Sequence, residues 1–273
     1  MRRALAGLGV FCTAFVAFAF LALPVLAIFV HVTPGRLLSQ LGSGVVTDAL
    51  VVSLKTTVVA VALILALGTP AAWLLASRRF PGRALLVTLA ELPLVLPPAV
   101  AGIGLIVAFG RIGLVGSPLA SAGIEVGYTQ AAVVLALTFV ASPLYVLQAV
   151  SAFEAIDPDL VAASRTLGAG PPKTFFHVVL PLARSGLAAG AAMAFARALG
   201  EFGATIMFAG SLRGVTQTLS LAIYAEFNDD FDAALAMSAL LVVVSAALLV
   251  ALRLTLQWQP SRSTSRSLFA AST

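Results

Sequence analysis

The chain has 273 residues, of which 60% are hydrophobic and 10% charged, with a formal net charge of +5 and a mean hydropathy of +1.07. Soluble domains are about 45–50% apolar and about 25% charged, so the composition argues against a soluble enzyme and against disorder. The basic residues are scattered, which argues against nucleic-acid binding. One cysteine, Cys12, and two distant histidines, His31 and His177, offer no disulfide framework or metal-ligand cluster. We therefore expect a membrane protein without a metal or cofactor.

Six stretches of the chain are long and apolar enough to cross a bilayer, which takes about 20 residues. We predict an all-α membrane protein with spans at 5–30, 50–76, 85–109, 131–150, 186–208 and 233–254. The first is too long for the 7–15-residue core of a signal peptide. Prolines or glycines interrupt the third and fifth spans. In the fifth span, Gly186 and Gly190 favour close contact with a neighbouring helix. We expect residues 1–258 to form one transmembrane domain, followed by a disordered cytoplasmic tail at 259–273.

The positive charges in the loops orient these spans. With the amino terminus in the cytoplasm, eleven Lys and Arg residues lie inside and three outside, which is the bias expected of membrane proteins. The inner set is Arg2, Arg3, Arg78, Arg79, Arg83, Arg165, Lys173, Arg184, Arg253, Arg262 and Arg266; the outer set is Arg36, Arg111 and Arg213. Both termini are therefore predicted to be cytoplasmic.

Four charged residues fall within or near the apolar spans. A charge at the bilayer centre costs about 2.5–3.5 kcal/mol on insertion scales, and such residues usually face a bundle interior or a water-filled path. Lys55 and Glu91 lie near span ends, so each either reaches the interface or faces the bundle interior. Arg197 and Glu201 are four residues apart and can pair on one helix face. That pair is either purely structural or part of a translocation path.

The longest cytoplasmic loop, residues 151–184, has its own helical pattern. Asp157 and Asp159 can cap a short helix, with Pro158 in its first turn. Gly168 can end that helix, and a second amphipathic segment at 174–180 leads back to the membrane. The prolines after Gly170 have no N–H groups to cradle a phosphate, so this is not an ATP-binding loop.

This loop carries a recognisable spacing of small and aliphatic residues. The positions are Ala162, Ala163, Ser164, Gly168, Val178, Leu180 and Pro181. Their spacing resembles the cytoplasmic signature of permease subunits of binding-protein-dependent ABC importers, although that family usually has Glu at 162 and Ala at 164. The resemblance implies a type I importer architecture, with six spans and a coupling helix that docks on a separate ATPase subunit. Asp157, Asp159 and Arg165 would then contact the rim of the ATPase groove.

Further segments resemble the molybdate and sulfate branch of the family. They are residues 53–55, 92–98 and 197–204, whereas 205–210 and 216–224 look more like molybdate than sulfate permeases. The resemblance implies the permease subunit of a molybdate importer, with tungstate as co-substrate, in the plasma membrane of a prokaryote. Two copies would form the pore, an extracytoplasmic molybdate-binding protein would deliver the anion, and the partner ATPase would hydrolyse ATP, so the chain itself is not an enzyme.

Tetrahedral oxyanions are held by N–H and hydroxyl donors and by cations. The candidate pore residues are Ser53, Lys55, Thr56, Arg197, Glu201 and Thr205. Three alternatives remain open. They are a sulfate or thiosulfate importer, a secondary transporter driven by an ion gradient, and a membrane-embedded enzyme. The last is disfavoured because no activated nucleophile or metal motif is present.

Overall fold

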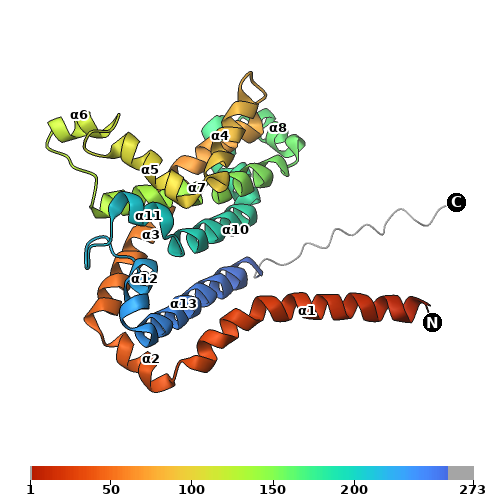
Figure 1. Ribbon diagram of the computed structural model, residues 1–273. Coiled ribbons are helices and arrows are strands. Elements are labelled where there is room, and N and C mark those ends of the chain that lie inside the picture. Colours follow the sequence, from red (N-terminus) through yellow and green to blue (C-terminus); the bar gives the residue numbers. More distant parts are fainter. Residues whose placement is uncertain (1, 258–273) are drawn as a thin grey trace.

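The computed structural model describes residues 2–257, and every regular element in that range is a helix (Figure 1). The α-helices are α1 (Arg2–His31), α2 (Pro34–Leu41), α3 (Gly44–Ser77), α4 (Arg83–Val95), α5 (Pro98–Phe109), α6 (Gly116–Ser121), α7 (Gln130–Glu154), α8 (Pro158–Thr166), α9 (Pro171–Thr174), α10 (Leu180–Leu199), α11 (Gly203–Ala209), α12 (Leu219–Asp229) and α13 (Phe231–Gln257). A π-helix, η1 (Phe175–Val179), joins α9 to α10. The predicted tail at 259–273, with Arg262 and Arg266, lies outside the described residues.

Within the described residues, five helical stretches are long and apolar enough to cross a membrane, and one bent helix pair makes a sixth. The five are Phe11–His31, Gly44–Ser77, Gln130–Glu154, Pro171–Leu199 and Phe231–Ala251. The sixth, predicted at 85–109, consists of α4 and α5 bent by 117° at the break between them. Pro97 and Pro98 explain the break, because a residue before proline avoids the helical conformation and Leu96 is extended. The six-span prediction is confirmed in this form.

The fifth predicted span, 186–208, has the wrong limits. The helical stretch begins at Pro171 and ends at Leu199, and a short separate helix, α11, follows the break at 200–202. The amphipathic segment at 174–180 is therefore continuous with the span. Its π-helical turn ends at Val179, two residues before Pro181, whose missing N–H removes one ordinary helical hydrogen bond.

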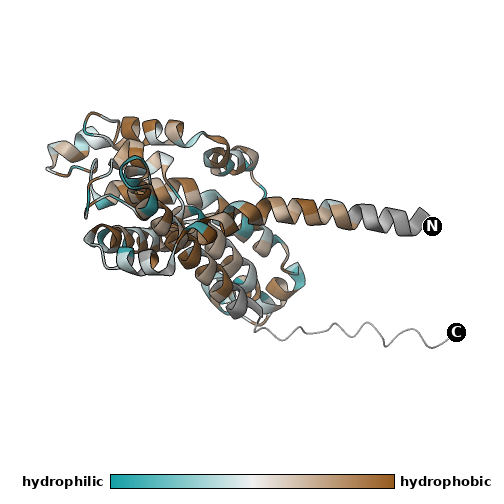
Figure 2. Ribbon diagram, turned by 60° about the horizontal axis from the view of Figure 1, so that its bottom comes forward, coloured by the Kyte–Doolittle hydropathy of each residue, from teal (hydrophilic) through white to brown (hydrophobic). Residues whose placement is uncertain are grey.

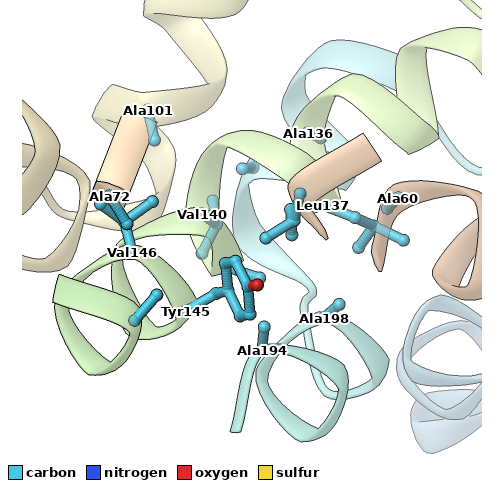
Figure 3. Close-up of a cluster of buried hydrophobic side chains, with 14 of the residues drawn as sticks. Ala60, Ala72, Ala101, Ala136, Leu137, Val140, Tyr145, Val146, Ala194 and Ala198 are labelled. Atoms are coloured by element: carbon cyan, nitrogen blue, oxygen red, sulfur yellow. The ribbon is translucent and has the colours of Figure 1, made fainter. Parts of the chain in front are cut away.

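The core lies where α3, α7 and α10 pack together around Tyr145, whose ring is surrounded mostly by alanine and other small side chains (Figure 3). The Tyr145 hydroxyl is hydrogen-bonded to Thr69 Oγ1 at 2.6 Å. Gly68 and Gly190 make room for the ring, because a Cβ atom at either would lie 3.0–3.2 Å from a ring carbon. Small residues thus let three spans approach one another closely.

The prediction for Gly186 is also confirmed by the packing of α10 on α7. A Cβ atom built at Gly186 would overlap the Cβ of Ala152. The helix backbones therefore approach more closely here than any larger residue permits.

Helix α1 extends away from the other spans and contacts α13 (Figure 1). Its apolar stretch Phe11–His31 contains no buried residue, and Figure 2 colours it as largely hydrophobic. Phe11, Phe18 and Phe20 are each more than two thirds exposed. In a membrane protein, such a helix faces lipid or another subunit.

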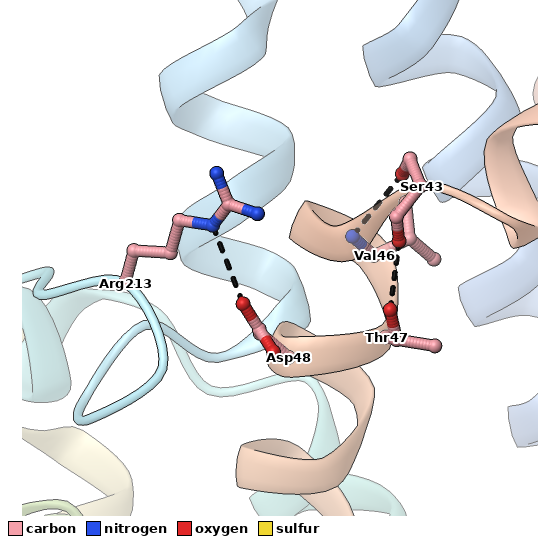
Figure 4. Close-up of polar contacts among 5 residues, drawn as sticks. All are labelled: Ser43, Val46, Thr47, Asp48 and Arg213. Atoms are coloured by element: carbon pink, nitrogen blue, oxygen red, sulfur yellow. Dashed lines mark hydrogen bonds and ion pairs between the residues drawn. The ribbon is translucent and has the colours of Figure 1, made fainter.

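The amino end of α3 is fixed by local caps and one distant ion pair (Figure 4). Ser43 Oγ accepts a hydrogen bond from Val46 N at 3.3 Å, and Thr47 Oγ1 donates to Ser43 O at 2.8 Å. Arg213 Nε lies 3.3 Å from Asp48 Oδ2. The segment between α11 and α12 is thereby tied to the start of α3.

Candidate functional site

Helix α8 has the capped form predicted from the sequence. Asp157 Oδ1 accepts a hydrogen bond from Asp159 N at 2.9 Å, and Pro158 occupies the first helical position. The chain leaves the helix at Gly168, whose φ of +83° favours glycine. The acidic residue in the first turn and Arg165 in the last turn both complement the helix dipole.

The outer surface of α8 is exposed and partly apolar. Leu160 and Leu167 are 48% and 88% exposed. Ala162, Ala163 and Arg165 are exposed as well. Exposed apolar side chains beside charged ones are typical of a surface that contacts another protein.

Ser164 attaches α8 to the helix that enters the membrane. Its hydroxyl lies 3.1 Å from Thr174 Oγ1, and Thr174 is buried. Val178 and Leu180, from the second half of the predicted motif, are partly buried in the stretch Pro171–Leu199, and Pro181 is exposed there. The motif therefore divides between an exposed helix and the start of a span.

An aromatic cluster supports the same region. The ring centroids of Trp73 and Phe153 lie 5.4 Å apart, and those of Trp73 and Phe175 lie 5.7 Å apart. These separations fall in the range of favourable aromatic contacts. The cluster joins the ends of α3 and α7 to η1, which contacts α8.

Arg197 and Glu201 form the predicted ion pair, but they do not share one helix face, because α10 ends at Leu199 and Glu201 lies in the break before α11. Arg197 Nη1 lies 2.6 Å from Glu201 Oε2, and Glu201 Oε1 accepts a hydrogen bond from Ala204 N at 2.8 Å. The Glu201 side chain is 1% exposed, whereas that of Arg197 is 33% exposed. A buried carboxylate needs such partners. Glu201 thus joins the end of α10 to the start of α11, and part of the arginine remains at the chain surface.

Three other predicted pore residues are buried. Ser53 Oγ accepts a hydrogen bond from Leu219 N at 2.7 Å, which caps α12 from another helix. Thr56 Oγ1 donates to Val52 O at 2.7 Å within α3. Thr205 is fully buried, and its hydroxyl has no hydrogen-bond partner. Lys55 differs from these three because it is exposed on α3.

Further buried polar residues were missed by the sequence analysis. They are Thr57, Thr216, Gln217 and Thr218. Thr216 Oγ1 accepts a hydrogen bond from Leu212 N at 2.9 Å, which holds the turn before α12. The run Thr216–Gln217–Thr218 was noted for its resemblance to molybdate permeases, but its burial was not foreseen. Polar residues from α3 and from the segment before α12 therefore lie within the fold, and Ser53 joins the two directly.

A metal centre has no support in residues 2–257. No group of three or more His, Cys, Asp or Glu residues in that part of the chain is placed to hold an ion. The charged groups among the predicted pore residues that do interact are Arg197 and Glu201, which form an ion pair.

Residues 64–262 match the family described as binding-protein-dependent transport system inner membrane component. The molybdenum transport system permease protein ModB of Mycobacterium tuberculosis is 45% identical over 87% of this chain and 90% of its own length. The sulfate transport system permease protein CysW of Synechocystis is 33% identical over 84% of this chain and 85% of its own length.

A solved structure has the same fold. It is a bacterial ABC transporter involved in the import of alginate, with a TM-score of 0.77 and 14% sequence identity over 94% of this chain and 96% of that one. The helical arrangement, the capped α8 and the sequence match are all consistent with the same family. The chain belongs to the family of inner membrane components of binding-protein-dependent transport systems, whose members are multi-pass, non-catalytic membrane subunits.

Proposed function

We propose that this chain is the permease subunit of an ATP-driven importer for molybdate, with tungstate as co-substrate. The observation that carries the proposal is the contrast between two relatives. Identity is 45% over 87% of the chain with a molybdenum permease and 33% over 84% with a sulfate permease. The sulfate match keeps a sulfate or thiosulfate importer as the second candidate. Family membership argues against an ion-gradient transporter and against an enzyme.

In this proposal, α8 is the coupling helix and faces the cytoplasm. Support comes from its exposed apolar side chains and from the basic residues around it, which suit the cytoplasmic side of a membrane. The ATPase subunit receives α8, and both termini of the chain are cytoplasmic. A binding protein delivers the anion to the opposite side, where Asp48 and Arg213 lie.

Two copies of the chain form the pore. A path between two copies must be lined by residues that reach the surface of one copy; Lys55 is exposed and the Arg197 side chain is one-third exposed. Arg197 is the proposed contact for the passing anion. Glu201 already neutralises part of its charge, so binding is weak enough for release. Ser53, Thr56 and Thr205 are buried within one copy, and we assign them a supporting role.

The substrate is tested by ATP-dependent uptake in proteoliposomes that contain the chain, its ATPase and its binding protein. We expect uptake of molybdate that tungstate inhibits and a large excess of sulfate does not. Equal or better competition by sulfate would transfer the assignment to a sulfate importer. The absence of any ATP-dependent oxyanion uptake by a folded complex would refute the import function.

The pore assignment is tested by Arg197→Ala and Thr205→Ala. We expect Arg197→Ala to lower the uptake rate at unchanged expression. Arg111→Ala is the matched control, because Arg111 also pairs with a carboxylate, that of Glu125 at 3.5 Å, but both side chains of this pair are largely exposed. If both Arg197→Ala and Thr205→Ala kept the wild-type rate, the pore assignment would be withdrawn.

A further inference from the structure

A positively charged hollow lies between the end of α3 and helix α8. Two cavities of about 630 and 670 Å³ share part of their walls. The shared lining is Trp73, Ser77, Arg78, Arg79 and Arg165. We call these joined cavities the basic hollow.

The arginines of the basic hollow are mostly unpaired. Arg83 Nη2 donates to Glu154 Oε1 at 2.6 Å, and Arg83 Nε donates to Leu75 O at 2.7 Å. This pair neutralises the one carboxylate of the lining. Among the described residues, Arg78, Arg79 and Arg165 have no acidic partner. The hollow therefore carries an uncompensated positive charge.

The position of the basic hollow matches the headgroup layer of a bilayer. Arg78 and Arg79 directly follow the last residue of the membrane-spanning helix α3. Trp73 lies one turn earlier, and tryptophan is enriched at membrane interfaces. The aromatic rings of Phe153 and Phe175 complete an apolar wall beside the arginines. A site that is apolar on one side and cationic on the other fits a lipid with an anionic headgroup.

We infer that the basic hollow binds the phosphate headgroup of an anionic phospholipid, of the phosphatidylglycerol type, with Arg78 and Arg79 as its main contacts. Arginine suits this role because its planar group of donors matches phosphate oxygens. The lipid fills the space beneath α8, between the membrane and the surface that receives the ATPase. The placement of this site in the cytoplasmic leaflet rests on the proposed function, but binding itself does not.

The test uses fluorescence of Trp73 in the full-length chain in lipid nanodiscs. Trp258→Phe leaves Trp73 as the single tryptophan of the chain. All discs contain the same minor fraction of phosphatidylglycerol in phosphatidylcholine. Brominated acyl chains, which quench tryptophan, are carried either by the phosphatidylglycerol or by an equal amount of the phosphatidylcholine. Stronger quenching by the first set measures enrichment of the anionic lipid at Trp73.

We expect at least about fivefold enrichment, the effect of roughly one basic residue near an anionic surface. The double variant Arg78→Gln/Arg79→Gln should lose it. The matched control Lys173→Gln/Arg184→Gln removes the same charge from exposed positions outside the lining of the hollow and should keep it.

Three results would overturn the inference. They are equal quenching by the two brominated lipids, an equal loss of enrichment in the control, and unchanged enrichment in Arg78→Gln/Arg79→Gln with weaker ATPase binding. The last result would assign the hollow to the ATPase. Because no step requires transport, lipid enrichment in a chain that fails to import molybdate would separate this inference from the proposed function.

Discussion

Replacing Glu201 should destabilise the junction of α10 and α11 by an amount that the structure allows us to bound. Glu201→Gln keeps an oxygen that can accept from Ala204 N but loses the charged contact with Arg197 at 2.6 Å. A hydrogen bond to a charged group contributes about 1.5–3 kcal/mol. Glu201→Ala loses the same contact and also leaves Ala204 N without its acceptor, which adds about 1–3 kcal/mol.

These free energies translate into measurable melting temperatures. At about 2–4 °C per kcal/mol for a chain somewhat smaller than this one, Glu201→Gln should lower Tm by about 3–12 °C, and Glu201→Ala by more. The assay is thermal unfolding of the purified chain in nanodiscs, combined with a double-mutant cycle that adds Arg197→Met. We expect the two substitutions to be non-additive by about 0.5–3 kcal/mol.

Two results would refute this reasoning. A Glu201→Gln variant that melts with the wild type would mean that the buried charge contributes nothing to the junction. Strictly additive effects of Glu201→Gln and Arg197→Met would mean that the 2.6 Å contact carries no coupling energy. Either result would also remove the basis for the proposed weakening of anion binding at Arg197.

The remaining predictions concern the core and α8. Tyr145→Phe should destabilise the chain by about 0.5–1.5 kcal/mol through loss of its 2.6 Å hydrogen bond, measured by thermal unfolding; no change would mean that the bond is not formed. Gly186→Ala should cost about 1–3 kcal/mol by overpacking, whereas Gly104→Ala, where a Cβ meets nothing within 4 Å, should not; equal effects would contradict the close approach. Asp157→Ala should lower the stability of α8 by about 0.5–2 kcal/mol and weaken ATPase binding, measured by co-purification. Gly168→Ala should strain the turn that ends α8 by about 1–2 kcal/mol, and wild-type ATPase binding in both α8 variants would argue against that helix as the docking element.

The features that the sequence predicted well depend on neighbouring residues. Asp157 and Gly168 delimit α8 through capping and a left-handed turn, and both effects act within a few residues. The pairing of Arg197 with Glu201 was predicted from their spacing of four residues, although Glu201 lies in the break after α10 and not on its face. The break between α4 and α5 follows from adjacent prolines.

The features that were missed depend on contacts between distant parts of the chain. The cap that Ser53 provides for Leu219 joins residues 166 positions apart, and no local pattern encodes it. The contact of Ser164 with Thr174 likewise needs α8 to fold back on the next helix. The start of the fifth span was misplaced because the polar residues near Lys173 interrupt the apolar run, although the helix continues through them.

The continuity of the stretch Pro171–Leu199 has a mechanical consequence. Its 29 residues extend about 43 Å at 1.5 Å per residue. One end is fastened to α8 by Ser164, and the other ends beside Glu201. Such a helix acts as a lever, because a tilt of a few degrees at its base displaces its far end by a few ångströms. A small movement imposed on α8 would therefore reach the Arg197–Glu201 pair enlarged, without any signal having to pass from side chain to side chain.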